Sequence, residues 1–104
     1  MGQERVRVVV ERSGGLAGRT LPPTTLDTAD LSPSEADRVR ALVADAGVEA
    51  LPTVSRTPRG RDMWQYAVTI QRGEETRRLR CDDGSVPSTL RPLLDLVLER
   101  GRPA

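Results

Sequence analysis

The chain contains no histidine and no lysine, and its 104 residues include a single cysteine and only two aromatic side chains. The absence of histidine removes the usual general base and the commonest metal-ligating side chain. One cysteine, Cys81, excludes an internal disulfide and, without a histidine, argues against a cysteine nucleophile. We therefore expect no enzymatic activity, no cofactor and no metal site. We interpret Cys81 as a buried structural thiol.

A strong excess of one charge is also missing, because 16 arginines stand against 15 acidic residues and leave a net charge of +1. That balance argues against nucleic acid or a membrane as the main partner. Four arginines nevertheless gather around one predicted strand: Arg72, Arg77, Arg78 and Arg80. Together with Trp64 and Tyr66, which are spaced like a stacking platform, they keep nucleic-acid binding as a weaker alternative. We favour a solvated face for the arginines and core packing for the aromatic rings.

Long hydrophobic runs are absent too. No stretch approaches the roughly 20 apolar residues that a membrane-spanning helix needs. The apolar run Val8–Val10 is too short for the apolar region of a signal peptide. A single cysteine fits a reducing compartment. We expect one domain over residues 1–104, a cytoplasmic location and a monomer when the protein is free.

The spacing of the apolar residues that are present predicts the fold. Val6, Val8 and Val10 alternate as on a half-buried strand, and Ser32 followed by Pro33 is typical of a helix start. The predicted elements are strands at 4–12, 19–27, 63–72 and 75–82, helices at 33–46 and 88–100, and a loop at 51–62. We predict an α+β fold with a four-stranded antiparallel sheet and two helices packed on one face, in the order β-β-α-β-β-α.

One loop is longer than the fold requires. It lies between the first two predicted strands and consists of Ser13, Gly14, Gly15, Leu16, Ala17 and Gly18. Two residues can close a hairpin, whereas this loop places a large apolar side chain between glycines. Leu16 either folds back into the core or fills an apolar pocket of a partner, as interface anchors do.

The neighbouring acids Asp82 and Asp83 form the one carboxylate pair with chemical interest. Calcium or magnesium needs more oxygen ligands than the Asp82-Asp83-Gly84 segment offers. We therefore interpret the pair as part of a strand-to-helix turn, with its acids near a helix N-terminus.

The run from Glu11 to Gly18 resembles the hallmark of the emfourin family, whose members are protein inhibitors of thermolysin-like (protealysin-type) metallopeptidases. Further similarities extend over most of the chain: Asp27-Thr28, Ala41-Leu42-Val43, the strand with Tyr66, Asp82-Asp83-Gly84-Ser85-Val86-Pro87 and Leu90-Arg91-Pro92-Leu93-Leu94. Leu16 stands where many relatives carry Phe. Because both side chains are large and apolar, the departure concerns protease preference more than inhibition itself.

The resemblance implies a cytoplasmic inhibitor of a metallopeptidase. Thermolysin-like enzymes cut before a large apolar residue and use a zinc ion held by two histidines and a glutamate, with a water in the open position. Leu16 would then occupy the main specificity pocket, Ala17 would fit beside it, and the loop glycines would set the conformation. In an alternative mechanism, carboxylates approach the zinc or block the cleft rim: Asp27, Asp30, Asp82 and Asp83. An adaptor that binds another protein on the same scaffold is an alternative function, and a role of the 51–62 loop is left open.

Overall fold

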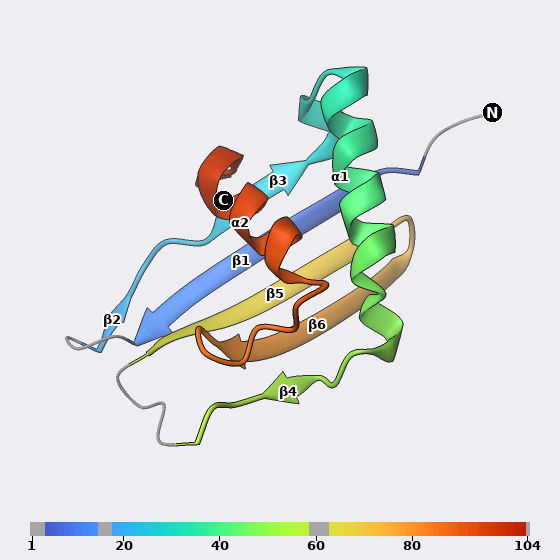
Figure 1. The fold of residues 1–104 in the computed structure, drawn as a ribbon. Helices are drawn as coiled ribbons and strands as arrows, with labels where there is room; N and C mark the ends of the chain where they lie inside the picture. Colours follow the sequence, from blue (N-terminus) through green and yellow to red (C-terminus); the bar gives the residue numbers. More distant parts are fainter. Residues whose placement is uncertain (1–3, 15–17, 59–62, 104) are drawn as a thin grey trace.

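The computed structural model describes residues 4–14, 18–58 and 63–103. This part of the chain forms seven strands, two α-helices and two short 3-10 helices (Figure 1). The strands are β1 (Val6–Gly14), β2 (Arg19–Thr20), β3 (Thr24–Asp27), β4 (Val54–Ser55), β5 (Trp64–Arg72), β6 (Glu75–Asp82) and β7 (Arg102–Pro103). The helices are η1 (Thr28–Asp30), α1 (Pro33–Ala46), η2 (Val48–Ala50) and α2 (Arg91–Arg100).

The seven strands make one mixed sheet in the order β4-β6-β5-β1-β3-β7, and β2 pairs with β1 off this path. Every pair is antiparallel except β4 with β6, which is parallel. The α+β class and its two α-helices are confirmed. The prediction of a four-stranded, purely antiparallel sheet is wrong.

The additional strands have local physical causes. Pro22 and Pro23 have no backbone N–H to donate, so the predicted strand at 19–27 is divided into β2 and β3. The segment 51–62, predicted as a loop, contains β4, whose Val54 pairs with Arg80. Arg80 also donates its backbone N–H to the carbonyl of Thr53 at 2.8 Å.

Both helices pack on the same face of the sheet (Figure 1). α1 begins as predicted, because the Ser32 hydroxyl accepts a hydrogen bond from the Glu35 backbone N–H at 3.3 Å. α2 begins at Arg91 rather than at residue 88, since a turn in which the Leu90 N–H bonds to the Pro87 carbonyl precedes it. Neither helix of the described chain is long and apolar enough to cross a bilayer.

The core is aliphatic and lies between the helices and one face of the sheet. Its strand side chains alternate as the sequence predicts, and its helix side chains come from one stripe of each helix. The fully buried members are Val6, Val8, Val10, Val39, Val43, Val48, Val68, Ile70, Leu90, Leu93, Leu94 and Val97. The opposite face of the sheet, which we call the open face, carries the alternate side chains of the central strands, including those of Glu11, Ser13, Gln65 and Arg80.

Candidate functional site

The glycine-rich loop leaves the sheet from the end of β1. Ser13 and Gly14 pair with Thr20 and Arg19 of β2 on one side and with β5 on the other. Gly14 has a φ of 96°, and a Cβ placed there would lie 3.0 Å from the carbonyl oxygen of Met63. Only glycine fits this conformation and this close approach without strain. The hairpin base is therefore a defined structure.

Most of the predicted binding loop lies beyond that base. Gly15, Leu16 and Ala17 fall outside the described residues. Gly18 is described, is exposed and has a φ of 59°. The structure thus places Ser13, Gly14 and Gly18 at one end of the sheet, and the predicted anchor Leu16 stays a prediction.

The Asp82-Asp83 pair reaches the same end of the sheet. Ser13 of β1 is opposite Gln65 of β5, and Gln65 is opposite Asp82 of β6. Two strand spacings of about 4.8 Å put Asp82 roughly 10 Å from the base of the glycine loop. The structure therefore brings two separate parts of the predicted site together.

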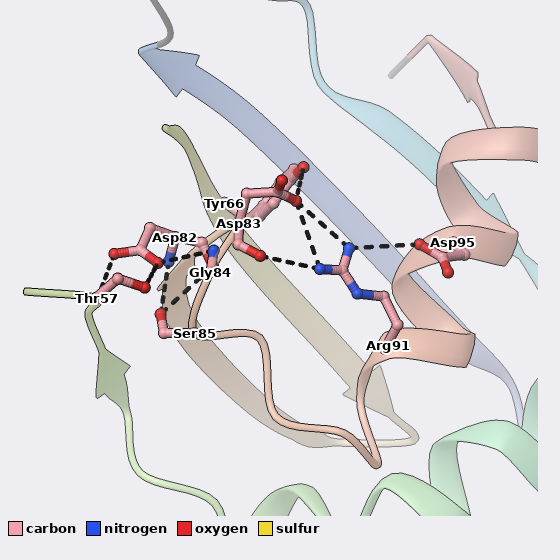
Figure 2. Close-up of polar contacts among 8 residues, drawn as sticks. All are labelled: Thr57, Tyr66, Asp82, Asp83, Gly84, Ser85, Arg91 and Asp95. Atoms are coloured by element: carbon pink, nitrogen blue, oxygen red, sulfur yellow. Dashed lines mark hydrogen bonds and ion pairs between the residues drawn. The ribbon is translucent and has the colours of Figure 1, made fainter. Parts of the chain in front are cut away.

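Asp82 is buried and holds two segments in place. Its carboxylate accepts hydrogen bonds from the backbone N–H and the hydroxyl of Thr57, both at 2.6 Å, and from the Gly84 N–H at 3.1 Å (Figure 2). Burial by itself raises the pKa of the Asp82 carboxyl, but the hydrogen bonds outweigh it and leave the pKa lowered. Asp82 thus stays ionised and fastens the segment after β4 to the end of β6.

Ser85 makes a second connection between the same segments. Its hydroxyl donates to the carbonyl of Ser55 at 2.8 Å and accepts from the Asp82 backbone N–H at 3.1 Å. The two segments approach closely at Gly84, where a Cβ would lie 2.5 Å from the Thr57 hydroxyl oxygen. We call the contacts among Ser55, Thr57, Asp82, Gly84 and Ser85 the Asp82 latch.

Asp83 is exposed, in contrast to its neighbour. Its carboxylate accepts a hydrogen bond from the Tyr66 hydroxyl at 3.0 Å, and Arg91 donates to its backbone carbonyl at 3.0 Å (Figure 2). Burial of the ring, with the Asp83 hydrogen bond, raises the pKa of Tyr66. The Arg91 guanidinium also lies 3.7 Å from the Asp95 carboxylate. Asp83 is therefore a positioned carboxylate at the edge of the site.

Asp27 and Asp30 lie at the other end of the sheet. Asp27 is opposite Arg7, seven residues along β1 from Gly14, which is roughly 23 Å. Its carboxylate accepts hydrogen bonds from the Arg5 guanidinium and from the Ala29 N–H, and the Arg5 bond holds its pKa below the ordinary value. The structure does not bring Asp27 or Asp30 to the glycine loop.

Sequence reasoning missed the residues that bind Asp82. Thr57 lies in a segment predicted as a loop, and it is 25 residues away from Asp82 in the chain. No local pattern connects the two. The Asp-Asp-Gly-Ser run did indicate a turn, and the N–H of Ser85 bonds to the Asp82 carbonyl at 3.0 Å.

The remaining titratable groups offer little chemistry. The described residues contain no group of three or more histidine, cysteine, aspartate or glutamate side chains placed to hold a metal ion. Cys81 is buried, as predicted, and burial raises the pKa of its thiol. Tyr66 packs in the core, as expected of the aromatic rings, with 7% of its surface exposed.

The predicted basic strand is mostly engaged within the molecule. Arg72 pairs with Glu49, and Arg78 pairs with Glu11. Arg77 donates to the carbonyls of Val48 and Leu51. These contacts weaken the interpretation of this strand as a nucleic-acid surface.

Comparison with protein families gives a match over most of the chain. The model of the family described as Emfourin matches residues 10–98, which is most of the chain and includes the glycine loop and the Asp82 latch. No curated protein and no solved structure matches.

Proposed function

Because the chain belongs to the Emfourin family, which points to a role as a protease inhibitor, we propose that it inhibits a thermolysin-like zinc metallopeptidase. In this proposal the glycine-rich loop between β1 and β2 enters the active-site cleft, and Leu16 occupies the main specificity pocket. The observation that carries the proposal is the position of the loop base, Ser13 and Gly14, at an end of the sheet that the latch and β5 hold in a fixed arrangement.

The anchoring of the loop base supports this mechanism. β1 pairs with β5 along nine residues, up to Gly14 opposite Trp64. A loop whose base is held in this way has less conformational freedom to lose at its ends on binding, which favours affinity. In the proposed mechanism, this anchoring of the base also hinders the movement needed to bring a peptide bond into attack geometry, which would slow cleavage.

The positions of the four predicted carboxylates do not favour the alternative mechanism, in which carboxylates approach the zinc ion. Asp82 accepts three hydrogen bonds inside the protein and is 2% exposed, so breaking the latch to reach a zinc ion would be costly. Asp27 and Asp30 lie at the far end of β1. Asp83 alone among these four is both exposed and near the loop base. The geometry therefore favours insertion of Leu16, with Asp83 at the cleft rim.

The test is a titration of a thermolysin-like peptidase, preferably one encoded beside this gene, with the purified protein. We expect stoichiometric loss of peptidase activity. Leu16→Asp should weaken inhibition about 100-fold or more, since a charged side chain cannot fill an apolar pocket without a desolvation cost. Thr76→Asp is the matched control, because it adds the same charge to an exposed position at the far end of β6.

The two variants separate the role of Leu16 from a general charge effect. Urea unfolding of both should match the unsubstituted protein. An unchanged inhibition constant for Leu16→Asp would exclude Leu16 as the anchor. No inhibition by the unsubstituted protein would instead favour the adaptor function, and capture of partners from the native cell would then identify what binds.

A further inference from the structure

A groove on the open face runs beside the glycine loop. It has a volume of about 400 Å³, and its lining includes Ser13, Thr20, Val54, Arg56, Arg78 and Arg80. Ser13 and Thr20 pair at the base of the glycine loop, so the groove begins where the proposed binding loop begins. We call it the basic groove.

The charge of this groove departs from that of the whole chain. Four arginines line it, whereas Glu11 is the single carboxylate among the described residues that line it. Glu11 is already paired with Arg78 at 3.3 Å. Arg56 and Arg80 are exposed, and no carboxylate of the described residues pairs with either. Although the net charge of the chain is only +1, the groove holds two arginines, Arg56 and Arg80, that pair with no carboxylate of the described residues.

The groove also carries an apolar contact point. Val54 is 49% exposed and is the one large apolar side chain of the described residues that is exposed to this extent. It lies opposite Arg80 in the β4–β6 pair, two residues before Arg56. Guanidinium groups bind carboxylates with two parallel hydrogen bonds, so the groove fits a partner segment that presents acidic side chains beside an apolar one.

We propose that the basic groove docks an acidic segment on the cleft rim of the inhibited peptidase, and this inference rests on the proposed function. Charge complementarity selects the occupant, and the shared boundary at Ser13 and Thr20 makes the groove continuous with the loop that enters the cleft. The Asp82 latch supports the groove, because it fixes the segment from Ser55 to Thr57 that carries Arg56. Arg56 and Arg80 then steer the peptidase and fix the angle at which the loop enters.

The same cations would also attract nucleic acid, but their surroundings favour a protein. Binding of single strands relies on stacking of bases on exposed aromatic rings. Tyr66 is buried, and Trp64 is partly buried against the core. The groove therefore offers charge without a stacking surface.

The test compares two double variants with the same change in net charge. Arg56→Glu with Arg80→Glu reverses the groove, whereas Arg38→Glu with Arg102→Glu reverses two exposed arginines on α1 and β7. The association rate constant with the inhibited thermolysin-like peptidase is measured at about 20 mM and about 500 mM salt. We expect the groove variant to associate about tenfold more slowly at low salt and to lose most of its salt dependence. The control variant should stay within about twofold of the unsubstituted protein.

Several outcomes would overturn the inference. Unchanged association by a groove variant that still inhibits would overturn the docking proposal and leave the inhibitor function intact. Equal slowing by both double variants would assign the effect to net charge. Absence of inhibition by the unsubstituted protein would overturn both proposals.

Two additional measurements test whether a loss of stability or the binding of nucleic acid accounts for the result. If the glutamate substitutions lower stability in urea, Arg56→Gln with Arg80→Gln replaces them, and about threefold slower association is then expected. Titration with a short single-stranded oligonucleotide at low salt should show no binding. Binding that the groove variant abolishes would reassign the groove to nucleic acid and overturn the proposal.

Discussion

The two ends of the sheet each bury one aspartate, but they stabilise its charge in different ways. At the loop end, Asp82 accepts hydrogen bonds from uncharged groups of Thr57 and Gly84. At the far end, Asp27 is bound by the guanidinium of Arg5, whose side chain is 66% exposed. Hydrogen bonds from fixed neutral donors do not depend on dissolved ions, whereas an ion pair with an exposed partner is screened by salt.

This difference bears on how the molecule can bind. At the loop end no cation holds Asp82, and no carboxylate of the described residues pairs with Arg56 or Arg80. At the far end, the guanidinium of Arg5 holds the buried Asp27. At the end where we propose that the peptidase binds, neutral groups thus hold the buried carboxylate, and the exposed arginines take no part in holding it.

Acid should have the largest effect, because it acts on both ends at once. The pKa values of Asp82 and Asp27 are lowered in the folded protein, below the ordinary value of 3.8 that applies to the unfolded chain. Their contribution to stability is therefore fully present well above pH 4 and is lost as the pH falls through the folded values. We expect the urea midpoint to be equal at pH 7 and pH 6 and clearly lower at about pH 3.

The acid effect also has a control. A double variant, Asp27→Asn with Asp82→Asn, should lose much less of its remaining stability between the same pH values. An equally steep loss in this variant would show that other carboxylates cause the acid sensitivity.

Asp82→Asn should be the most damaging of the single substitutions. An amide can accept through its oxygen alone, and its NH₂ group would face donors on Thr57 or Gly84. We expect a loss of about 2 kcal/mol in the free energy of unfolding, measured in urea, with little dependence on salt. Asp45→Asn, an exposed change on α1, is the control and should have an effect within about 0.5 kcal/mol. Equal losses for the two would refute the latch.

Asp27→Asn should cost less, and its cost should fall with salt. The exposed Arg5 is solvated in both the folded and the unfolded chain, so the ion pair gains little over water. The Ala29 N–H, which bonds to the Asp27 carboxylate, can still bond to the amide oxygen of the substituted side chain. Urea unfolding at low and at high salt measures the difference. A loss that matches Asp82→Asn and does not change with salt would erase the distinction between the two ends.

The sequence predicts the elements whose signals are local. Alternating valines indicate β1, and the Ser32-Pro33 start indicates α1; both are confirmed. The sequence does not predict β4, because two residues carry no periodicity and their strand exists only through pairing with Arg80 and Cys81. β7, which pairs with β3 after α2, was missed for the same reason.

The candidate site likewise contains features with a local sequence signal and features that depend on contacts between distant residues. The glycines at the loop base have a conformational signal in the sequence, and Gly14 does take a positive φ. The partner of Asp82 has none, since Thr57 reaches it only after the sheet has formed. The basic groove was also not evident, because Arg78 and Arg80 share it with Val54, which belongs to a segment that was expected to be a loop.

The smallest expected effect concerns Tyr66 and tests how firmly Asp83 is positioned at the loop end. Tyr66 is the chain's one tyrosine, so its ionisation can be followed directly by ultraviolet absorbance. Burial and the Asp83 hydrogen bond both raise its pKa. Asp83→Asn removes the nearby negative charge, and the pKa of Tyr66 should fall but stay above the ordinary 10 because the ring remains buried. Stability should change by about 0.5–1 kcal/mol.

Asp95→Asn is the matched control for this last measurement. The carboxylates of Asp83 and Asp95 lie 3.5 Å and 3.7 Å from the Arg91 guanidinium, so both variants remove a carboxylate next to Arg91. Asp95→Asn leaves the Tyr66–Asp83 hydrogen bond in place, so the pKa of Tyr66 should stay where it is. If Asp83→Asn and Asp95→Asn shift the Tyr66 titration equally, Asp83 acts only through general charge. In that case the loop end would have one fixed carboxylate, the buried Asp82, and the exposed Asp83 could not be expected to meet a peptidase in a defined orientation.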